Sequence, residues 1–287
     1  MLSIALALVS AASWGTGDFL GGMAARRYAL VWVLAAASFG GLVLATVASF
    51  ASGQPFPPAD DVALAAAAGL AGLVALAAFY NALAIGTMSI VAPISATGTA
   101  IPVLWGIAAR GEDISVIAGV GIIVLLGGVI LASREQDAAA TGEAVPVNHR
   151  LSVLLALVAA VGFGTIFVLI AESSGTSQFW PSAILKAASL VGTLLVIAVI
   201  GRRIKGTRPS HREWLFPVSV GFFDVTANIT YASATHRGQI AIASVVAAMY
   251  PVVTVLLAQT FLKERMAPSQ KVGVVLALVG VLVLAAS

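Results

Sequence analysis

The chain has 287 residues, of which 60% are hydrophobic and only 9% are Asp, Glu, Lys or Arg. Soluble domains carry about 25% charged residues because their surface must face water, so this composition excludes an ordinary soluble domain. It excludes disordered, collagen-like and coiled-coil chains as well, and the absence of cysteine excludes disulfide-stapled folds and Cys-based metal sites. We therefore predict a polytopic membrane protein whose main surroundings are the lipid bilayer.

Ten apolar stretches are long enough to cross the hydrocarbon core as helices. They span residues 3–22, 30–50, 62–80, 85–107, 114–132, 151–171, 180–200, 214–233, 239–261 and 269–286. Helices are expected rather than barrel strands because the stretches are continuously apolar instead of alternating. The first stretch has no Lys or Arg before it, which argues against a signal peptide. The sequence thus predicts an all-α membrane protein with ten transmembrane helices.

An internal repeat divides the chain into two halves. A shift of 152 residues aligns 61–133 with 213–285 without a gap and pairs several glycines and acids. The pairs include Gly69 with Gly221, Gly86 with Gly238, Glu112 with Glu264, Gly121 with Gly273, and Gly128 with Gly280. We therefore expect a five-helix repeat at 1–133, a linker at 134–150 and a second repeat at 151–287.

Because five is odd, the second copy enters the membrane from the opposite side. Inverted repeats around a central cavity are the basis of many secondary transporters. A duplication that merely enlarged a structural protein is the alternative.

The basic residues predict an orientation. Of the fifteen Lys and Arg residues, Lys186 lies inside a predicted helix, Arg110 and Arg237 follow even-numbered helices, and the other twelve follow odd-numbered ones. Cytoplasmic loops are rich in Lys and Arg, so the linker is expected in the cytoplasm and both termini outside. The chain has a net charge of +3, but its basic residues are spread over these loops, which does not favour nucleic-acid binding.

Three ionisable residues lie at bilayer depth, where a charge is costly and is usually functional. They are Asp18, Lys186 and Asp224. Asp224, Asn228 and Tyr231 are spaced i, i+4, i+7 and share one helical face. That face could line a substrate or proton site, or Lys186 and Asp224 could form a structural ion pair. The two interpretations are compatible.

Trp14 and Asp18 lie on one face of a glycine-rich run at residues 14–22. The run is not a nucleotide-binding loop, because no strand precedes it and no Walker lysine follows. Its glycines allow close helix packing or local unwinding around a substrate.

Prolines interrupt two predicted helices that correspond in the repeat: Pro93 and Pro102 in the fourth and Pro251 in the ninth. Proline bends a helix and frees a carbonyl, which suits a gating helix but also occurs in helices that do not move.

Aromatic side chains could line a pocket for a planar or apolar substrate. The candidates are Trp14, Tyr80, Phe163, Tyr231 and Tyr250. Such rings also form belts at the membrane interface. Asn81 either contacts substrate or caps a tight turn between the third and fourth helices.

Nothing in the sequence suggests catalysis. His149, His211 and His236 lie in loops, and motifs for zinc proteases, nucleotide binding and serine hydrolases are absent. We therefore expect no enzyme, no catalytic residue, no metal and no cofactor. An intramembrane enzyme or lipid-handling protein is the rival class.

Each predicted half ends with a Glu in a short polar loop and a glycine-spaced final helix. These features are Glu112 with Gly121 and Gly128, and Glu264 with Gly273 and Gly280. With Trp14-Gly15 and the spacing from Pro251 to Glu264, they make the whole chain resemble EamA-type members of the drug/metabolite transporter superfamily. In the repeat, Thr99 of the first half is the counterpart of Pro251 in the second half. The first half therefore has no proline at this position, and equal bending of the two helices is not expected.

The resemblance implies a basket of helices in the bacterial inner membrane that exports small metabolites by alternating access. Amino acids, including aromatic ones, are the implied substrates, with Asp18, Lys186 and Asp224 as charged cavity residues. No ATP-binding motif is present, so transport would be facilitated or coupled to an ion or proton gradient. An import permease for sugars or other metabolites is the alternative. The oligomeric state is left open.

Overall fold

The computed structural model describes residues 1–25, 27–85, 94–95, 97–132, 149–204, 206–210, 212–261 and 267–286. Within these ranges the regular secondary structure is helical. The start of the predicted fourth helix, including Pro93, and nearly all of the linker fall outside the described residues.

The helices follow the predicted apolar stretches closely. The first half contains α1 (Leu2–Ala25), α2 (Leu30–Ser52), α3 (Ala59–Ile85), η1 (Thr97–Thr99), α5 (Ala100–Arg110) and α6 (Val116–Ala132). The second half contains α7 (His149–Glu172), α8 (Trp180–Ile200), η3 (Gly201–Arg203), α9 (Leu215–Arg237), α10 (Ile240–Ala247), α11 (Tyr250–Phe261) and α12 (Pro268–Ala286). The stretch predicted at 239–261 is therefore two helices, separated at Ala248 and Met249.

The turn expected at Asn81 is wrong, because α3 continues through this residue to Ile85. The neighbouring alanines and leucine are strong helix formers. The Asn81 side-chain amide donates to the Ala77 carbonyl oxygen one turn earlier, at 2.7 Å, and so bonds within its own helix.

Seven helical segments of the described chain are long and apolar enough to cross a membrane. They are α1, α2, α3, α7, α8, the α10–α11 pair and α12, with α6 as a shorter apolar helix of 17 residues. The polar helix α9 is not among the seven, although it packs against both α1 and α2. The protein is thus a multi-pass membrane protein, and the count of ten spans stays a prediction.

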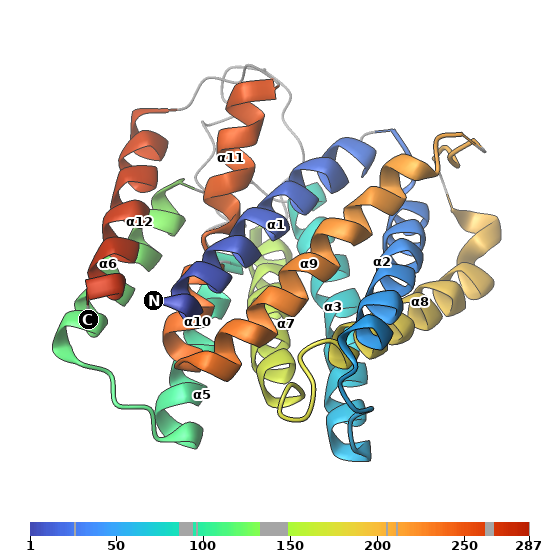
Figure 1. The fold of residues 1–287 in the computed structure, drawn as a ribbon. Coiled ribbons are helices and arrows are strands. Elements are labelled where there is room, and N and C mark those ends of the chain that lie inside the picture. Colours follow the sequence, from blue (N-terminus) through green and yellow to red (C-terminus); the bar gives the residue numbers. More distant parts are fainter. Residues whose placement is uncertain are drawn as a thin grey trace.

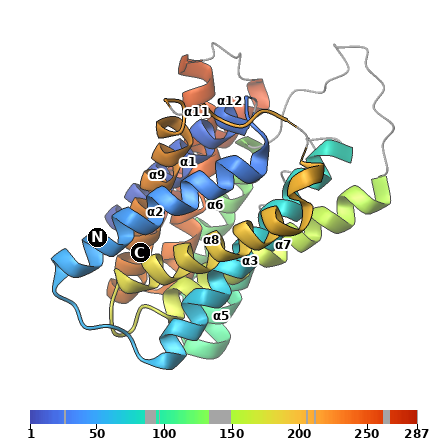
Figure 2. The ribbon, with the colours of Figure 1, turned by 90° about the vertical axis from the view of Figure 1, so that its right-hand side faces the viewer.

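The helices pair across the two halves in a pattern that the repeat relates (Figures 1 and 2). The first helix of each half packs on the third helix of the other half, as α1 on α9 and α7 on α3. The second helices pack there too, α2 on α9 and α8 on α3. The helices α6 and α12 lie side by side at one edge of the bundle, and α2 and α8 at the other (Figure 1).

Backbone contacts at glycines repeat in the same way. A methyl group on Gly69 of α3 would lie 2.3 Å from the Leu185 carbonyl oxygen of α8, and one on Gly221 of α9 would lie 1.9 Å from that of Ala37 in α2. At the α6–α12 contact, methyl groups on Gly128 and Gly273 would each lie 2.3 Å from a backbone nitrogen of the facing helix. Small residues permit this approach between membrane helices, so Gly69, Gly221, Gly128 and Gly273 lie at helix-crossing points.

We predict that Gly221→Ala destabilises the protein. Alanine would ordinarily favour a helix by about 1 kcal/mol over glycine, but here its methyl group meets the Ala37 backbone. Overpacking of this kind costs about 1–3 kcal/mol. Thermal unfolding in detergent measures the effect.

Gly72→Ala is the matched control, because its methyl group would make an ordinary 3.7 Å contact with Ile166 Cδ1. Equal melting temperatures for the two variants would contradict the packing assigned to Gly221.

Candidate functional site

Two oppositely charged side chains join α8 to α9 near the middle of α9. Lys186 Nζ forms a salt bridge with Asp224 Oδ2. One turn further along α9, Asn228 Nδ2 donates to the same oxygen at 2.9 Å. The Lys186 side chain is 11% exposed and that of Asp224 is 30% exposed. The ion pair that the sequence allowed is therefore present, and Asp224 is its more accessible member.

The crossing of α2 and α9 makes room for the lysine. A methyl group on Gly41 of α2 would lie 3.1 Å from Lys186 Cδ and 3.1 Å from the Gly221 carbonyl oxygen. The aliphatic part of Lys186 thus runs beside the glycine crossing, while its ammonium group reaches the carboxylate of Asp224. Long basic side chains commonly bury their stem in this way.

Asp18 approaches the same group from α1. A methyl group on its neighbour Gly17 would lie 3.9 Å from the Asp224 backbone nitrogen, so Asp18 lies near Asp224 where α1 packs on α9. Asp18 is exposed and has no salt-bridge partner among the residues that the structure describes. Two carboxylates and one ammonium group, from α1, α8 and α9, therefore share this part of the bundle.

Within the glycine-rich run around Asp18, Gly15 allows a close helix contact. The helix α1 is continuous from Leu2 to Ala25, so its backbone is not locally unwound. A methyl group on Gly15 would lie 2.5 Å from the Tyr250 carbonyl oxygen, and one on the equivalent Gly164 would lie 2.2 Å from that of Gly98. The first helix of each half thus touches the interrupted helix of the other half.

An aromatic cluster lies next to the charges. The Trp14 ring is 5.1 Å from that of Phe167, 5.8 Å from Tyr231 and 6.4 Å from Tyr250. The rings of Phe167 and Tyr231 are 5.0 Å apart. Phe167 was not predicted from the sequence. For the first helix of each half the repeat corresponds to a shift of 149 residues, which pairs Trp14 with Phe163 and Asp18 with Phe167.

Tyr231 is fixed within this cluster. It is fully buried, and its hydroxyl oxygen lies 2.7 Å from Ser244 Oγ and donates to the Phe167 carbonyl oxygen at 3.1 Å. Tyr231 therefore closes the space beside Trp14 in this conformation.

The other predicted residues lie apart from the cluster. The Phe163 ring packs on Phe79 at 5.7 Å, and Asn81 is exposed on α3. The side chain of Tyr80 is outside the described part of the chain.

Of the three prolines predicted to act in gating, the structure describes Pro102 and Pro251, and each lies near the start of a helix. Pro102 is the third residue of α5 and Pro251 the second residue of α11. In the first turn of a helix the missing proline N–H costs little. Both prolines therefore follow a break in the helix, and their role in gating stays a prediction.

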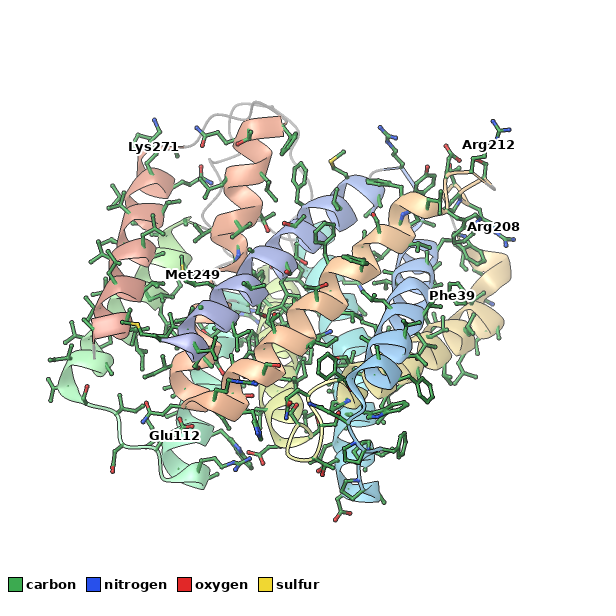
Figure 3. All side chains as sticks on the ribbon, viewed as in Figure 1. Phe39, Glu112, Arg208, Arg212, Met249 and Lys271 are labelled. Carbon is green, nitrogen blue, oxygen red and sulfur yellow. The ribbon has the colours of Figure 1, made fainter. Side chains whose placement is uncertain are left out.

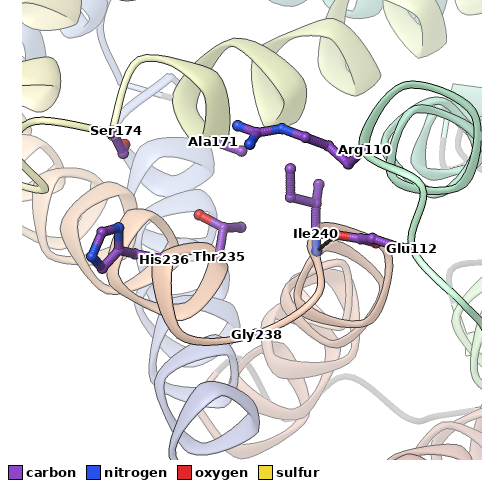
Figure 4. Close-up of a pocket in the computed structure, with 9 residues that line it drawn as sticks. Arg110, Glu112, Ala171, Ser174, Thr235, His236, Gly238 and Ile240 are labelled. Carbon is purple, nitrogen blue, oxygen red and sulfur yellow. Dashed lines mark hydrogen bonds between the residues drawn. The ribbon is translucent and has the colours of Figure 1, made fainter.

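A pocket of about 340 Å³ opens at one end of α5, α7 and α9 (Figure 4). Its lining is Arg110, Glu112, Ala171, Ser174, Gly175, Thr235, His236, Gly238 and Ile240. Beside it, Arg110 donates two hydrogen bonds to the Glu172 carboxylate, at 2.8 and 2.9 Å. Trp105 Nε1 donates a third to Glu172, at 2.7 Å.

The comparison with protein families now decides the class. The sequence model of the EamA-like transporter family matches residues 1–134 and again residues 150–286. The chain belongs to the EamA-like transporter family. Membership assigns this protein to the drug/metabolite transporter superfamily and agrees with the two repeats expected from the sequence.

Solved structures share the fold seen here. Twenty-nine chains of solved structures are similar to this one. One, described as "Crystal structure of protein", is 16% identical with a TM-score of 0.76 over 98% of this chain and 96% of its own. This likeness concerns the fold alone. No curated protein matches the chain.

We predict that Lys186→Met destabilises this EamA-family protein more than the double change Lys186→Met with Asp224→Asn. The single variant leaves the Asp224 carboxylate without its cation in a partly buried site, at a cost of about 1–3 kcal/mol. The double variant removes both charges and keeps a polar neighbour for Asn228. Melting temperatures in detergent compare the two. A double variant no more stable than the single one would contradict the pairing.

Proposed function

We propose that the protein exports amino acids by alternating access and that the charged group of Asp18, Lys186 and Asp224 is its substrate site. The observation that carries the proposal is the presence of both signs of charge on three neighbouring helices, α1, α8 and α9, from the two halves. A purely structural ion pair needs one carboxylate. Here a second carboxylate, on Asp18, lies on the helix that packs against α9.

A zwitterion fits this arrangement of charges. The Asp18 carboxylate, which has no salt-bridge partner among the described residues, can receive an α-ammonium group. Lys186 can receive the α-carboxylate as it exchanges its bond to Asp224. Charged hydrogen bonds of this kind are stronger than neutral ones, so they can offset the loss of hydration in the site.

The aromatic cluster suggests the side chain of the substrate. Trp14 and Tyr250 adjoin Asp18 and are only partly buried, whereas Tyr231 is fully enclosed. Planar and apolar side chains pack favourably against such rings. Aromatic amino acids are therefore our first candidates among the substrates.

Export also needs a direction and an energy source. Lys271, Arg208 and Arg212 lie at one end of the molecule and Glu112 at the other (Figure 3). The positive-inside rule then supports a cytoplasmic linker and external termini in a bacterial inner membrane. Coupling to a proton gradient would act through the two carboxylates, Asp18 and Asp224.

We expect saturable flux of a labelled aromatic amino acid into liposomes that contain the purified protein. Asp18→Asn should raise the half-saturating concentration about tenfold or more, because it removes one charged contact to the ammonium group. Asp60→Asn, on the exposed first turn of α3, is the matched control and should transport normally.

Absence of saturable flux for every amino acid would contradict the substrate class. Flux of sugars instead would favour the import-permease alternative. Product formation in detergent, without a sealed membrane, would favour an enzyme.

A reporter tag tests the proposed orientation. We expect a tag at either terminus to react with a membrane-impermeant reagent on intact cells, and a tag within residues 134–150 to react only after permeabilisation. The reverse pattern would invert the membrane topology.

A further inference from the structure

The end of α5 folds back toward the second half of the protein. Gly111 follows α5 in the left-handed conformation, with φ 63°, a region that glycine enters without steric cost. The Gly111 and Glu112 amides both donate to the Gly106 carbonyl oxygen, the latter at 2.9 Å. The turn aims the Glu112 side chain back along α5.

The Glu112 carboxylate binds the start of α10. Its Oε1 accepts from the Ile240 amide at 2.5 Å, and its Oε2 accepts from the Ala241 amide at 2.9 Å (Figure 4). Carboxylates are favourable at helix N-termini, where amides lack partners and the helix dipole is positive. In addition, Gln239 Nε2 donates to the Asp113 carbonyl oxygen at 2.8 Å.

Gly106 leaves the space that the carboxylate occupies. A methyl group on Gly106 would lie 2.2 Å from Glu112 Oε2. The contact between the halves thus depends on a glycine one turn before the end of α5 as well as on the acid. This dependence offers a second way to disturb the contact without changing Glu112.

These bonds lie at the end of a polar face that leads to the central charges. Asp224, Asn228, Tyr231 and Thr235 of α9 are spaced i, i+4, i+7, i+11 and share one helical face. This face covers about 16 Å along the axis and ends at Thr235, in the lining of the 340 Å³ pocket. Along this face the buried Tyr231, with its bond to Ser244, lies between Thr235 and Asp224.

We infer that Glu112 holds this end of the transport path closed, and that release of its bonds to α10 opens the path from the pocket to the central site. The helix α10 carries both Ile240, which lines the pocket, and Ser244, which holds Tyr231. Movement of α10 away from α5 would therefore widen the pocket and free Tyr231 together. The inference rests on the proposed function, because a transport path exists only in a transporter. The contact between Glu112 and α10 is tested by a measurement that does not depend on transport.

The absence of cysteine makes the test direct. Ala247→Cys introduces a single thiol at a fully buried position of α10, one turn from Ser244, and leaves the hydrogen bond between Tyr231 and Ser244 in place. The protein is reconstituted in liposomes and treated with a membrane-impermeant maleimide, and the rate of labelling is measured. Labelling after denaturation in detergent gives the total.

We expect slow labelling of Ala247→Cys alone, and labelling faster by about tenfold or more when Glu112→Ala is added, because hydrogen bonds to a charged group are lost. Glu112→Gln, which keeps one acceptor oxygen, should be intermediate. Gly106→Ala should also accelerate labelling. Asp113→Ala is the matched control, since its backbone carbonyl, not its side chain, accepts the bond from Gln239.

Equal labelling rates with and without Glu112→Ala, in protein of unchanged melting temperature, would overturn the inference and leave Glu112 as a simple helix cap. If Glu112→Ala lowers the melting temperature, the Gly106→Ala and Glu112→Gln rates decide. Because the readout is accessibility, a failure here is distinct from a failure to transport amino acids, which concerns the proposed function.

Discussion

The close approach of helix backbones across the two halves is the constraint on which the rest of the structure depends. Lipid removes the hydrophobic force between membrane helices, so packing must come from contact at short range. Gly69 and Gly221, and likewise Gly15 and Gly164, give that contact at positions related by the repeat. The crossing at Gly221 and Gly41 also brings Lys186 beside α9. The same small residues thus determine both the helix packing and the position of Lys186 in the site.

The repeat is symmetric in packing but not in chemistry. The position equivalent to Asp224 in the first half is Gly72, and the position equivalent to Asp18 in the second half is Phe167. The equivalent residues Asp18 and Phe167 thus contribute a carboxylate to the site and a ring to the aromatic cluster, respectively. The two halves therefore share a packing framework, while the Lys186–Asp224 ion pair belongs to the second half alone.

Sequence reasoning could predict the framework because its signals are strong. Long apolar stretches, paired glycines and three ionisable residues at bilayer depth each have one dominant physical explanation. Local chemistry was less predictable. Asn81 was expected near a turn but continues a helix by bonding to Ala77, and Tyr231 was expected to line a pocket but is enclosed by Ser244 and Phe167. These outcomes depend on which helix faces which, information that a periodic pattern does not contain.

The exchange of partners between halves has a consequence for synthesis. Because α1 packs on α9 and α3 packs on α7, the first repeat is synthesised before the helices that complete its packing exist. Until the second repeat has inserted, the glycine faces of the first repeat and the Asp18 carboxylate lie in the bilayer without their packing partners. A chain cut at the linker would therefore yield two fragments, neither of which has its own core, and the fold would form only when both are in the same membrane.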